Sequence, residues 1–372
     1  MTVVPPHQHP RDSGDAWVEG PDGGRHWGRY GAAGLLVHDA EAGILLQHRA
    51  EWSHFGGTWG LPGGARHEGE SAIDGAIREA GEEAGVPIDA LDLAFTSTLD
   101  LGYWSYVTVV TRTLRPFTPR IGDAESLELR WVPVDEVDGL PLHPAFGSSW
   151  PALRERLDDR VRIVVDAANV VGSRPDGWWK DRVGANEALL ERLTVLGAAG
   201  VAMSALGEPG AAESGADADA GADSDVGSDA LSGGTEARSW PSVTVVLEGQ
   251  AKRARAAEPR QLGGSLLLAP GAVDVSIAAG EGDDTIVEEA AAAVASGLRV
   301  LVVTADRELR ERVTAVGAEV RGPGWLLALA DAAAPDADAA APDADAAATD
   351  ADAAATDADP ASDAHPDVRG DG

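Results

Sequence analysis

The sequence predicts an α/β protein with two folded parts, each built on its own β-sheet. In the first part, strand-like segments surround a single amphipathic helix that is rich in glutamate. In the second part, short apolar runs alternate with helical stretches, which is typical of an open parallel sheet with helices on both faces. The 372 residues, 44% of them hydrophobic, are sufficient for two packed cores.

Composition narrows the class of protein. The chain has no cysteine, which excludes disulfides and thiolate metal sites. No apolar run approaches the ~18 residues of a membrane span, and no secretory signal is visible. We therefore expect a soluble, cytoplasmic protein with no membrane partner. The net charge of −33 argues against nucleic-acid binding, but much of it lies outside the parts that are expected to fold.

Three stretches lack the pattern of a folded domain. Residues 1–26 are rich in Gly, Pro, Asp and His, and residues 207–238 are mainly Gly, Ala, Asp and Ser. Residues 331–372 carry a seven-residue Ala/Asp repeat that offers no large apolar side chain to bury. We expect all three to be disordered, as an N-terminal tail, an acidic loop insertion and an acidic tail.

Residues 27–143 form the first predicted domain. Its helix begins after Ser71, which can form a capping box with Asp74, and it ends at Gly85. Apolar and β-branched runs on both sides of the helix predict strands, with Gly and Pro at the turns. The predicted strands are 31–38, 44–49, 93–99, 103–113 and 127–132.

Three glutamates share one side of the predicted helix. Glu79, Glu82 and Glu83 stand at i, i+3 and i+4, while the apolar residues of the helix repeat on a different side. Carboxylates this close repel one another, and a hard divalent cation such as Mg²⁺ would stabilise them. The alternative is a solvated acidic face, which is the commoner explanation for a run of charges.

The spacing around the helix favours a metal site. A glycine is followed by five residues, a glutamate, seven residues, and then Arg-Glu-Ala-x-Glu-Glu-x-Gly-Val. This pattern resembles the Nudix box of MutT-like hydrolases at every fixed position. The matching residues are Gly64, Glu70, Arg78, Glu79, Glu82, Glu83 and Gly85.

The resemblance implies a fold and an activity for residues 27–143. The fold is a mixed sheet sandwiched between helices. The activity is hydrolysis, dependent on Mg²⁺ or Mn²⁺, of the diphosphate in a nucleoside diphosphate linked to another moiety. In such reactions the metal neutralises the phosphates and lowers the pKa of the attacking water.

The resemblance also implies roles for individual residues. Glu79 and Glu83 would be the main metal ligands, and the carbonyl of Gly64 would assist. Glu82 is a further ligand candidate, and one of the three glutamates or a partner residue would act as a base. Arg78 would orient a glutamate through a charge-assisted hydrogen bond.

Supporting roles are less specific in the sequence. Glu70 is expected to support the loop or the helix start. Asp123, Glu125 and Glu128 precede or begin the last predicted strand, where a loop carboxylate could assist the metal, although exposed loop acids are an open alternative. The aromatic candidates for stacking on a base, each also suited to a core, are Trp27, Tyr30, Trp52, Trp59 and Trp104.

Residues 144–160 are predicted to hold a linker helix, and residues 161–330 to form the second domain. The continuous apolar run of residues 162–166 is typical of a buried parallel strand. The further predicted strands are 243–247, 273–277 and 300–303, and the predicted helices are 184–196, 284–295 and 307–316.

Aspartates follow several of these strands. Asp166 ends the first strand, Asp283 and Asp284 stand at a helix start after the third, and Asp306 follows the fourth. Because parallel strands end at one edge of a sheet, these acids are expected to converge there as a metal site. Plain helix capping is the alternative for each of the last three.

The surrounding motifs resemble the PIN-like/NYN ribonucleases. They are Val-Asp-Ala-Ala-Asn-Val at 165–170, Gly-Asp-Asp-Thr-Ile-Val at 282–287 and Val-Thr-Ala-Asp-Arg at 303–307. The resemblance implies a metal-dependent ribonuclease that uses the four aspartates, with Asn169 as a less certain member. An alternative for the whole chain is therefore an RNA-processing nuclease whose Nudix domain is a nucleotide sensor.

Basic and aromatic residues in the second domain fit single-stranded RNA as a partner. A solvated loop and a packed tryptophan pair explain them equally well. The residues concerned are Arg174, Trp178, Trp179, Lys180, Arg182, Lys252, Arg253, Arg255 and Arg260.

Overall fold

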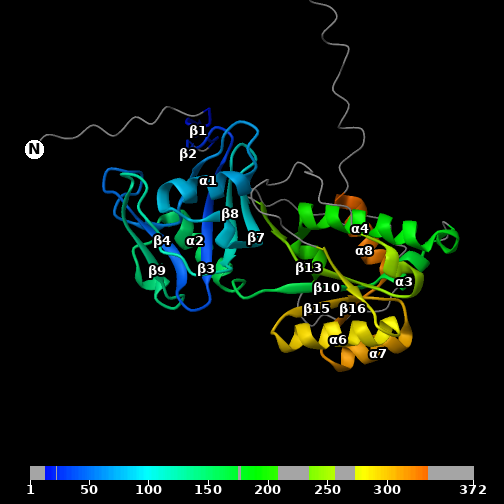
Figure 1. Ribbon diagram of the computed structural model, residues 1–372. Coiled ribbons are helices and arrows are strands. Elements are labelled where there is room, and N and C mark those ends of the chain that lie inside the picture. Colours follow the sequence, from blue (N-terminus) through cyan, green and yellow to red (C-terminus); the bar gives the residue numbers. More distant parts are fainter. Residues whose placement is uncertain (1–12, 22, 175–176, 208–233, 256–272, 334–372) are drawn as a thin grey trace, which may run out of the picture. The chain divides into compact units, whose positions relative to one another are not determined.

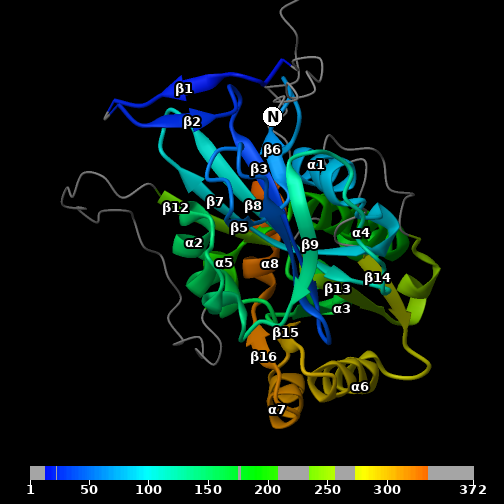
Figure 2. The same cartoon turned by 90° about the vertical axis from the view of Figure 1, so that its left-hand side faces the viewer.

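The structure is a computed structural model of the chain. It describes residues 13–21, 23–174, 177–207, 234–255 and 273–333. Two β-sheets dominate it (Figures 1 and 2). The first is built mainly from the N-terminal half of the sequence and also takes two strands from the C-terminal half, and the second comes from the C-terminal half alone. Within the described residues, no helix has the length and apolar character needed to cross a membrane.

The first sheet is mixed, as the sequence predicts. Its order is β11-β12-β7-β8-β3-β4-β5, with β6 paired to β3 and β9 paired to β4. The pair β3–β8 is parallel, and the other named pairs are antiparallel. The bounds are β3 Ala32–Asp39, β4 Gly43–Arg49, β5 Trp59–Gly60, β6 Gly63–Ala65, β7 Leu91–Asp100, β8 Ser105–Thr113, β9 Ser126–Val132, β11 Val201–Ala202 and β12 Gly234–Ser239.

Alternation along β3 gives the first sheet two buried faces. Leu35 belongs to the core that contains helix α1 (Ala72–Ala84), whereas Leu36 belongs to the core that contains helix α2 (Pro144–Arg154). Successive side chains of a strand point to opposite faces, so one strand serves both cores. The result is the helix–sheet–helix sandwich that the resemblance implied.

Helix α2 is more than a linker. The sequence predicted a connecting helix within residues 144–160, but Trp150 of α2 is fully buried, and Phe146 and Leu153 are nearly so. All three pack against strands of the first sheet. The prediction was incomplete because the apolar spacing of a short helix does not reveal which core receives it.

Part of the N-terminal stretch is ordered, so the expected disorder over residues 1–26 is wrong for this part. Strands β1 (Trp17–Glu19) and β2 (Arg25–Trp27) form an antiparallel hairpin in which Trp17 lies opposite Trp27. Residues 1–12 lie outside the described part of the chain. The hairpin escaped prediction because three-residue strands show too little alternation to recognise.

The second sheet has five strands and is parallel throughout, which confirms the prediction of an open parallel sheet. Its order is β14-β13-β10-β15-β16. The strands are β10 Val161–Asp166, β13 Ser242–Leu247, β14 Val273–Ile277, β15 Arg299–Val303 and β16 Glu319–Arg321.

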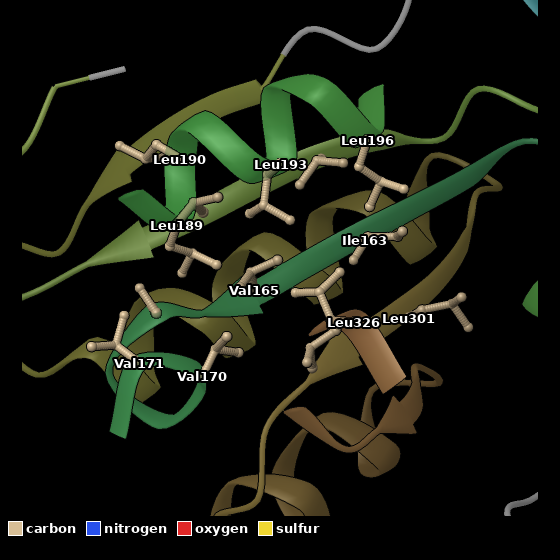
Figure 3. Close-up of a cluster of buried hydrophobic side chains, with 14 of the residues drawn as sticks. Ile163, Val165, Val170, Val171, Leu189, Leu190, Leu193, Leu196, Leu301 and Leu326 are labelled. Atoms are coloured by element: carbon tan, nitrogen blue, oxygen red, sulfur yellow. The ribbon is translucent and has the colours of Figure 1, made fainter. Parts of the chain in front are cut away.

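Helices cover both faces of this sheet. Ile163 and Val165 of β10 pack under the leucines of helix α4 (Arg182–Ala199) and against helix α8 (Pro323–Ala333) (Figure 3). Val164 points to the other face, against helices α6 (Gly282–Ala295) and α7 (Arg307–Ala315). The short helix α3 (Ala167–Gly172) follows β10 directly.

Several elements were not predicted. They include α5 (Met203–Leu206), β11, β16 and α8, and the 3₁₀ helices at 88–90, 137–139, 178–180 and 249–253. The expected disorder over 207–238 is wrong for β12, which starts at Gly234 and pairs with β7. Helix α8 likewise extends to Ala333, inside the predicted tail. Residues 208–233 and 334–372 lie outside the described residues.

Removing the Trp150 side chain tests whether α2 belongs to the first core. We expect Trp150→Ala to lower the free energy of unfolding by about 3–5 kcal/mol, because it empties a fully buried site. The exposed Ser148 on the same helix gives the control, and Ser148→Ala should change stability by less than about 0.5 kcal/mol. Equal, small effects in denaturant titrations of both variants would mean that α2 is only a linker.

Candidate active site

The site begins where a glycine pair meets helix α1. Gly63 and Gly64 lie in β6, which pairs with β3. A Cβ atom on Gly64 would lie 2.6 Å from a carboxylate oxygen of Glu79. Only glycine therefore lets the Glu79 carboxylate lie directly against this backbone.

Helix α1 is held at both ends in the way its sequence predicts. The Ser71 hydroxyl accepts a hydrogen bond from the Asp74 N–H at 3.1 Å. Gly85 ends the helix in the left-handed conformation, with φ 61°, and its N–H reaches back to Ala80 and Gly81 carbonyls. These caps set the turn of the helix on which the glutamates stand.

The three glutamates of the helix separate into two environments. Glu83 is 5% exposed, and the Glu79 side chain is 17% exposed. The Glu82 side chain is 64% exposed and lies at the margin, 3.5 Å from Arg78. Glu79 and Glu83, one turn apart, therefore form the buried pair, and Glu82 faces solvent.

Arg78 ties the helix to the preceding loop. Its Nε and Nη2 donate to the two carboxylate oxygens of Glu70 at 2.8 and 3.0 Å, and Nη2 also donates to the Ala65 carbonyl at 3.0 Å. Nη1 donates to Glu79 at 2.8 Å. The guanidinium thus fixes the orientation of the Glu79 carboxylate while Glu70 fixes the guanidinium, and the geometry fits the expected roles of both residues.

Opposing effects keep Glu70 ionised. Burial alone would raise the pKa of Glu70, but hydrogen bonds from Arg78 and from the His67 N–H outweigh it, so the pKa of the carboxyl is lowered. The same contact with Glu70 raises the pKa of Arg78. Arg78 is therefore a permanent cation beside the buried pair.

The buried pair has the opposite electrostatics. Burial raises the pKa of Glu79, although Arg78 opposes the shift. Burial also raises the pKa of Glu83 well above its usual value, and the charge of Glu79 adds to this. The Glu83 carboxylate accepts a hydrogen bond from the Gly63 N–H at 2.9 Å. Two buried carboxyls that each disfavour the other's charge are suited to share a cation.

A divalent cation fits these residues. Glu79, Glu83 and the Gly64 backbone would supply hard oxygen ligands of the kind that Mg²⁺ and Mn²⁺ prefer. Across the described ranges, no three His, Asp or Glu side chains converge closely enough to enclose a metal on their own. Mg²⁺ does not require this, since it keeps several waters and takes oxygens from substrate phosphates.

The loop before β9 brings further acids toward the pair. The charges of Asp123 and Glu125 both contribute to the raised pKa of Glu83. The loop approaches closely because Gly122 donates its N–H to the Glu83 carbonyl at 2.9 Å. Glu128, the third candidate, lies in β9 and is not among the charges that act on Glu83.

Sequence reasoning missed a group of residues beside the pair. Burial raises the pKa of the Tyr106 hydroxyl to about 12; the charge of Arg49 opposes this and that of Glu83 reinforces it. Arg49 ends β4 and also acts on His54 and His143. The strand patterns carried no sign that these side chains meet.

The aromatic candidates fall into different settings. Trp59 is 5% exposed, stacked on His48, and covered by the Arg130 guanidinium at 4.4 Å. Trp104 stacks on His26 and donates its Nε1–H to the Trp27 carbonyl at 3.1 Å. Trp27 and Trp52 are exposed, and Tyr30 is half-buried. Trp59 is therefore a core residue rather than a free stacking surface.

The carboxyl edge of the second sheet gathers acids from separate strands. Asp166 is 5% exposed; it accepts hydrogen bonds from the Asn169 N–H and side-chain amide and, at 2.8 Å, from the Thr304 hydroxyl. Asp306 caps α7 through the Leu309 N–H. These contacts agree with the capping alternative without excluding the predicted convergence.

Asp283 shows that the acids of this edge do interact. Burial raises its pKa, and the charges of Asp166, Asp306 and Glu248 contribute. Asp284 pairs with Arg312 at 2.5 Å, and the charge of Arg312 also acts on Asp283 and lowers its pKa. Glu248 was not predicted, although its position directly after β13 is the same signal that identified Asp166.

Some of the basic residues of the second domain are engaged locally. Arg174 pairs with Asp331 at 3.6 Å. The guanidinium of Arg182 covers the Trp178 ring at 5.3 Å, and the Arg255 side chain donates to the Lys252 carbonyl. Trp179 is 58% exposed. Lys180, Lys252 and Arg253 lie in 3₁₀ helices, and Arg260 falls outside the described residues.

The fold and the site define a hydrolase of phosphoanhydrides in which one helix carries the glutamates of the site. Residues 28–154 match the family model described as the NUDIX domain. The chain is 45% identical over 166 residues to "Putative 8-oxo-dGTP diphosphatase 3" of Mycobacterium tuberculosis, which covers 41% of this chain and 76% of the relative. The chain therefore belongs to the Nudix family, and it is a pyrophosphohydrolase.

Two further similarities concern the same part of the chain. A "Nucleoside triphosphate pyrophosphatase/Nudix hydrolase fusion protein" of Bifidobacterium longum is 40% identical over 165 residues, which are 42% of this chain and 34% of that protein. The solved Nudix hydrolase RenU of M. smegmatis is 46% identical, over 38% of this chain and 94% of its own, with a TM-score of 0.36.

Removing the support of Arg78 tests the geometry of the site. We expect Glu70→Ala to lower activity by about 10–100-fold, the range typical of residues that hold a metal ligand in position, because Arg78 loses its two hydrogen bonds to the Glu70 carboxylate. Glu68, exposed in the same loop, gives the control Glu68→Ala, which should keep wild-type kcat/KM. If the two variants have the same kcat/KM, Arg78 does not depend on Glu70.

Proposed function

We propose that the Nudix domain is a Mg²⁺- or Mn²⁺-dependent hydrolase of nucleoside diphosphates linked to another moiety, and that this moiety is a phosphate. The substrate is then a nucleoside triphosphate, and an oxidised purine such as 8-oxo-dGTP is the first to test. The name of the M. tuberculosis relative supports this choice. The observation that carries the proposal is the buried pair of mutually repelling carboxyls beside Gly64.

Each residue has a defined task in this proposal. Glu79 and Glu83 hold the metal with the Gly64 backbone, and Arg78 keeps Glu79 in position. Solvent-facing Glu82 is available to accept a proton from water. The bound metal supplies charge neutralisation for the phosphates and a lowered pKa for the attacking water. Hydrolysis adds the elements of water across the anhydride, so that one phosphate gains the hydroxyl oxygen and the bridging oxygen leaves with the other.

The variant Glu83→Gln separates catalysis from folding. We expect activity to fall by more than the ~10–100-fold loss typical of a residue behind a metal ligand, since a ligand itself is lost. Stability should be kept or increased, because a buried charge that disfavours folding is removed. Activity on a panel of nucleoside triphosphates and nucleoside diphosphate derivatives, with and without EDTA, and thermal melting check the two effects.

The proposal fails if wild-type protein with Mg²⁺ or Mn²⁺ turns over no member of the panel. It also fails if Glu83→Gln retains full activity. Loss of activity together with loss of the folded state would point to a structural role for Glu83 alone.

A second function is supported by the edge of the parallel sheet. We infer that the C-terminal part is a PIN-like, metal-dependent ribonuclease that acts on single-stranded RNA. Asp166, Asp283 and Asp306 arise from three separate strand ends, and the charges of the other two raise the pKa of Asp283. Clustered acids of this kind bind metal ions that activate water against a phosphodiester. In the corresponding alternative for the whole chain, the Nudix domain senses a nucleotide.

An RNA cleavage assay tests this inference. We expect Mn²⁺-dependent cleavage of single-stranded RNA that falls at least tenfold in the double variant Asp283→Asn with Asp306→Asn. Asp274→Asn is the matched control, because Asp274 is exposed near the start of β14, at the end of that strand remote from the carboxyl edge. If wild-type protein leaves RNA intact, or if the double variant cleaves as fast as the wild type, the ribonuclease inference is wrong.

A further inference from the structure

Five aromatic side chains form a continuous row at one end of the first sheet. Trp27 contacts Trp17 with ring centroids 5.3 Å apart, and Trp17 contacts His54 at 5.3 Å. His54 contacts Phe55 at 4.2 Å, and Phe55 contacts His143 at 4.7 Å. The four contacts are all edge-to-face. The row joins the N-terminal hairpin, the loop after β4 and the residue that precedes α2.

The row is exposed rather than packed into a core. Trp17 is 40% exposed, Trp27 is 39% exposed and Phe55 is 45% exposed. Large aromatic side chains at this exposure leave ring faces in contact with water. Exposed aromatic ring faces are unfavourable in water, and several of them in a row form an apolar surface. Such a surface is typical of a binding site.

Phe55 is held in a conformation that a phenylalanine seldom adopts. Its φ is 55°, in the left-handed region, and it is the only non-glycine residue with positive φ in the described part of the chain. The Thr58 hydroxyl donates to the Phe55 carbonyl at 2.6 Å. Such a conformation costs about 1–3 kcal/mol and is concentrated at functional sites. Glycine would adopt this conformation without the cost. The presence of phenylalanine therefore indicates that its exposed ring has a role that outweighs the cost in stability.

Arg49 connects the row to the catalytic residues. Its Nε donates to the His54 carbonyl at 3.1 Å, which anchors the loop that carries the rings. The same guanidinium and the Glu83 carboxylate both act on the Tyr106 hydroxyl. Arg49 therefore anchors the loop that carries Phe55 and acts on the same tyrosine as Glu83.

The hairpin end of the row is fixed to the Nudix loop as well. The Glu68 N–H donates to the Ser13 hydroxyl at 3.1 Å, and a Cβ on Gly14 would meet the Arg66 carbonyl. In both views the hairpin lies at the same end of the first sheet as α1 (Figures 1 and 2). Both ends of the row thus adjoin the loops of the active site.

We propose that this aromatic row binds the nucleobase of the substrate, with Phe55 stacked on the base. The inference rests on the proposed function, because it names the nucleoside side of the same substrate. Aromatic rings stack on every base through its flat face. Arg49, which anchors the loop that carries Phe55, has the charge to attract the phosphates of the same nucleotide.

The two histidines of the row suit this occupant. Burial lowers the pKa of His143 to about 4, with the charge of Arg49 adding to the effect, and burial also lowers the pKa of His54. Both rings are therefore neutral at pH 7. A neutral imidazole offers one donor and one acceptor, which can pair with the edge of a base.

Kinetics with and without a base on the substrate test the proposal. The probes are 8-oxo-dGTP and 2′-deoxyribose 5′-triphosphate, which has the same phosphates but no base. We expect Phe55→Gly to raise KM for 8-oxo-dGTP by about tenfold or more, the effect of one lost stacking ring, with a far smaller change for the base-free probe. The variant should fold well, because glycine adopts the φ of this position without strain.

Two further variants make the result specific. Phe55→Tyr keeps a ring and should restore KM close to the wild-type value. Leu114→Ala removes a large apolar side chain that is 67% exposed just after β8 and is not part of the row, and it should leave the base preference unchanged. Equal changes for both probes in Phe55→Gly, or an unchanged KM for 8-oxo-dGTP, would overturn the proposal.

Binding measurements keep the inference separate from catalysis. If wild-type protein hydrolyses neither probe, the proposed function fails, and equilibrium binding of 8-oxo-dGMP and of 2′-deoxyribose 5-phosphate then tests the row alone. Binding of 8-oxo-dGMP that is at least tenfold tighter, and that is lost in Phe55→Gly, supports the aromatic row as a base site. Equal binding of the two probes contradicts it.

Discussion

The burial of two like charges on one helix is the constraint on which the rest of the active site depends. Glu79 and Glu83 lie one turn apart with little contact to water; burial raises the pKa of both carboxyls, and the charge of Glu79 raises that of Glu83 further. Such a pair is retained only where several neighbouring groups hold it in place. Here Arg78 orients one carboxylate and the Gly63 N–H holds the other, while the absence of a side chain on Gly64 leaves room for Glu79.

The two sheets solve the problem of placing acids in different ways. In the first, a helix lying on the sheet brings glutamates to a glycine-rich strand, and a loop adds Asp123 and Glu125. In the second, parallel strands end at one edge, so that the charges of Asp166 and Asp306 act on Asp283 although the three residues share no element. The first arrangement depends on local helix periodicity, and the second depends on the register of a whole sheet.

In the aromatic row, features that suit ligand binding carry a cost in stability. Phe55 keeps an unfavourable backbone conformation, and Trp17 and Trp27 keep large ring surfaces in water. Folding gains from the cross-strand pair of Trp17 and Trp27, but it gains nothing from the left-handed conformation of Phe55. Trp17 and Trp27 lie on the N-terminal hairpin, and Phe55 lies on the loop that Arg49 anchors. Ligand binding by this row would account for all three.

Features that depend on the spacing of residues close together in the chain could be predicted from the sequence. The caps and glutamates of α1, the long strands of both sheets and the acids at strand ends follow from periodicity and turn chemistry, which act within a few residues. Folding at long range determines which glutamate is buried, the packing of α2 in the first core, and the action of the Arg49 charge on Tyr106 and His143. The structure also revealed the hairpin of Trp17 and Trp27. These features depend on packing between segments far apart in the chain, and neither propensity nor spacing encodes that packing.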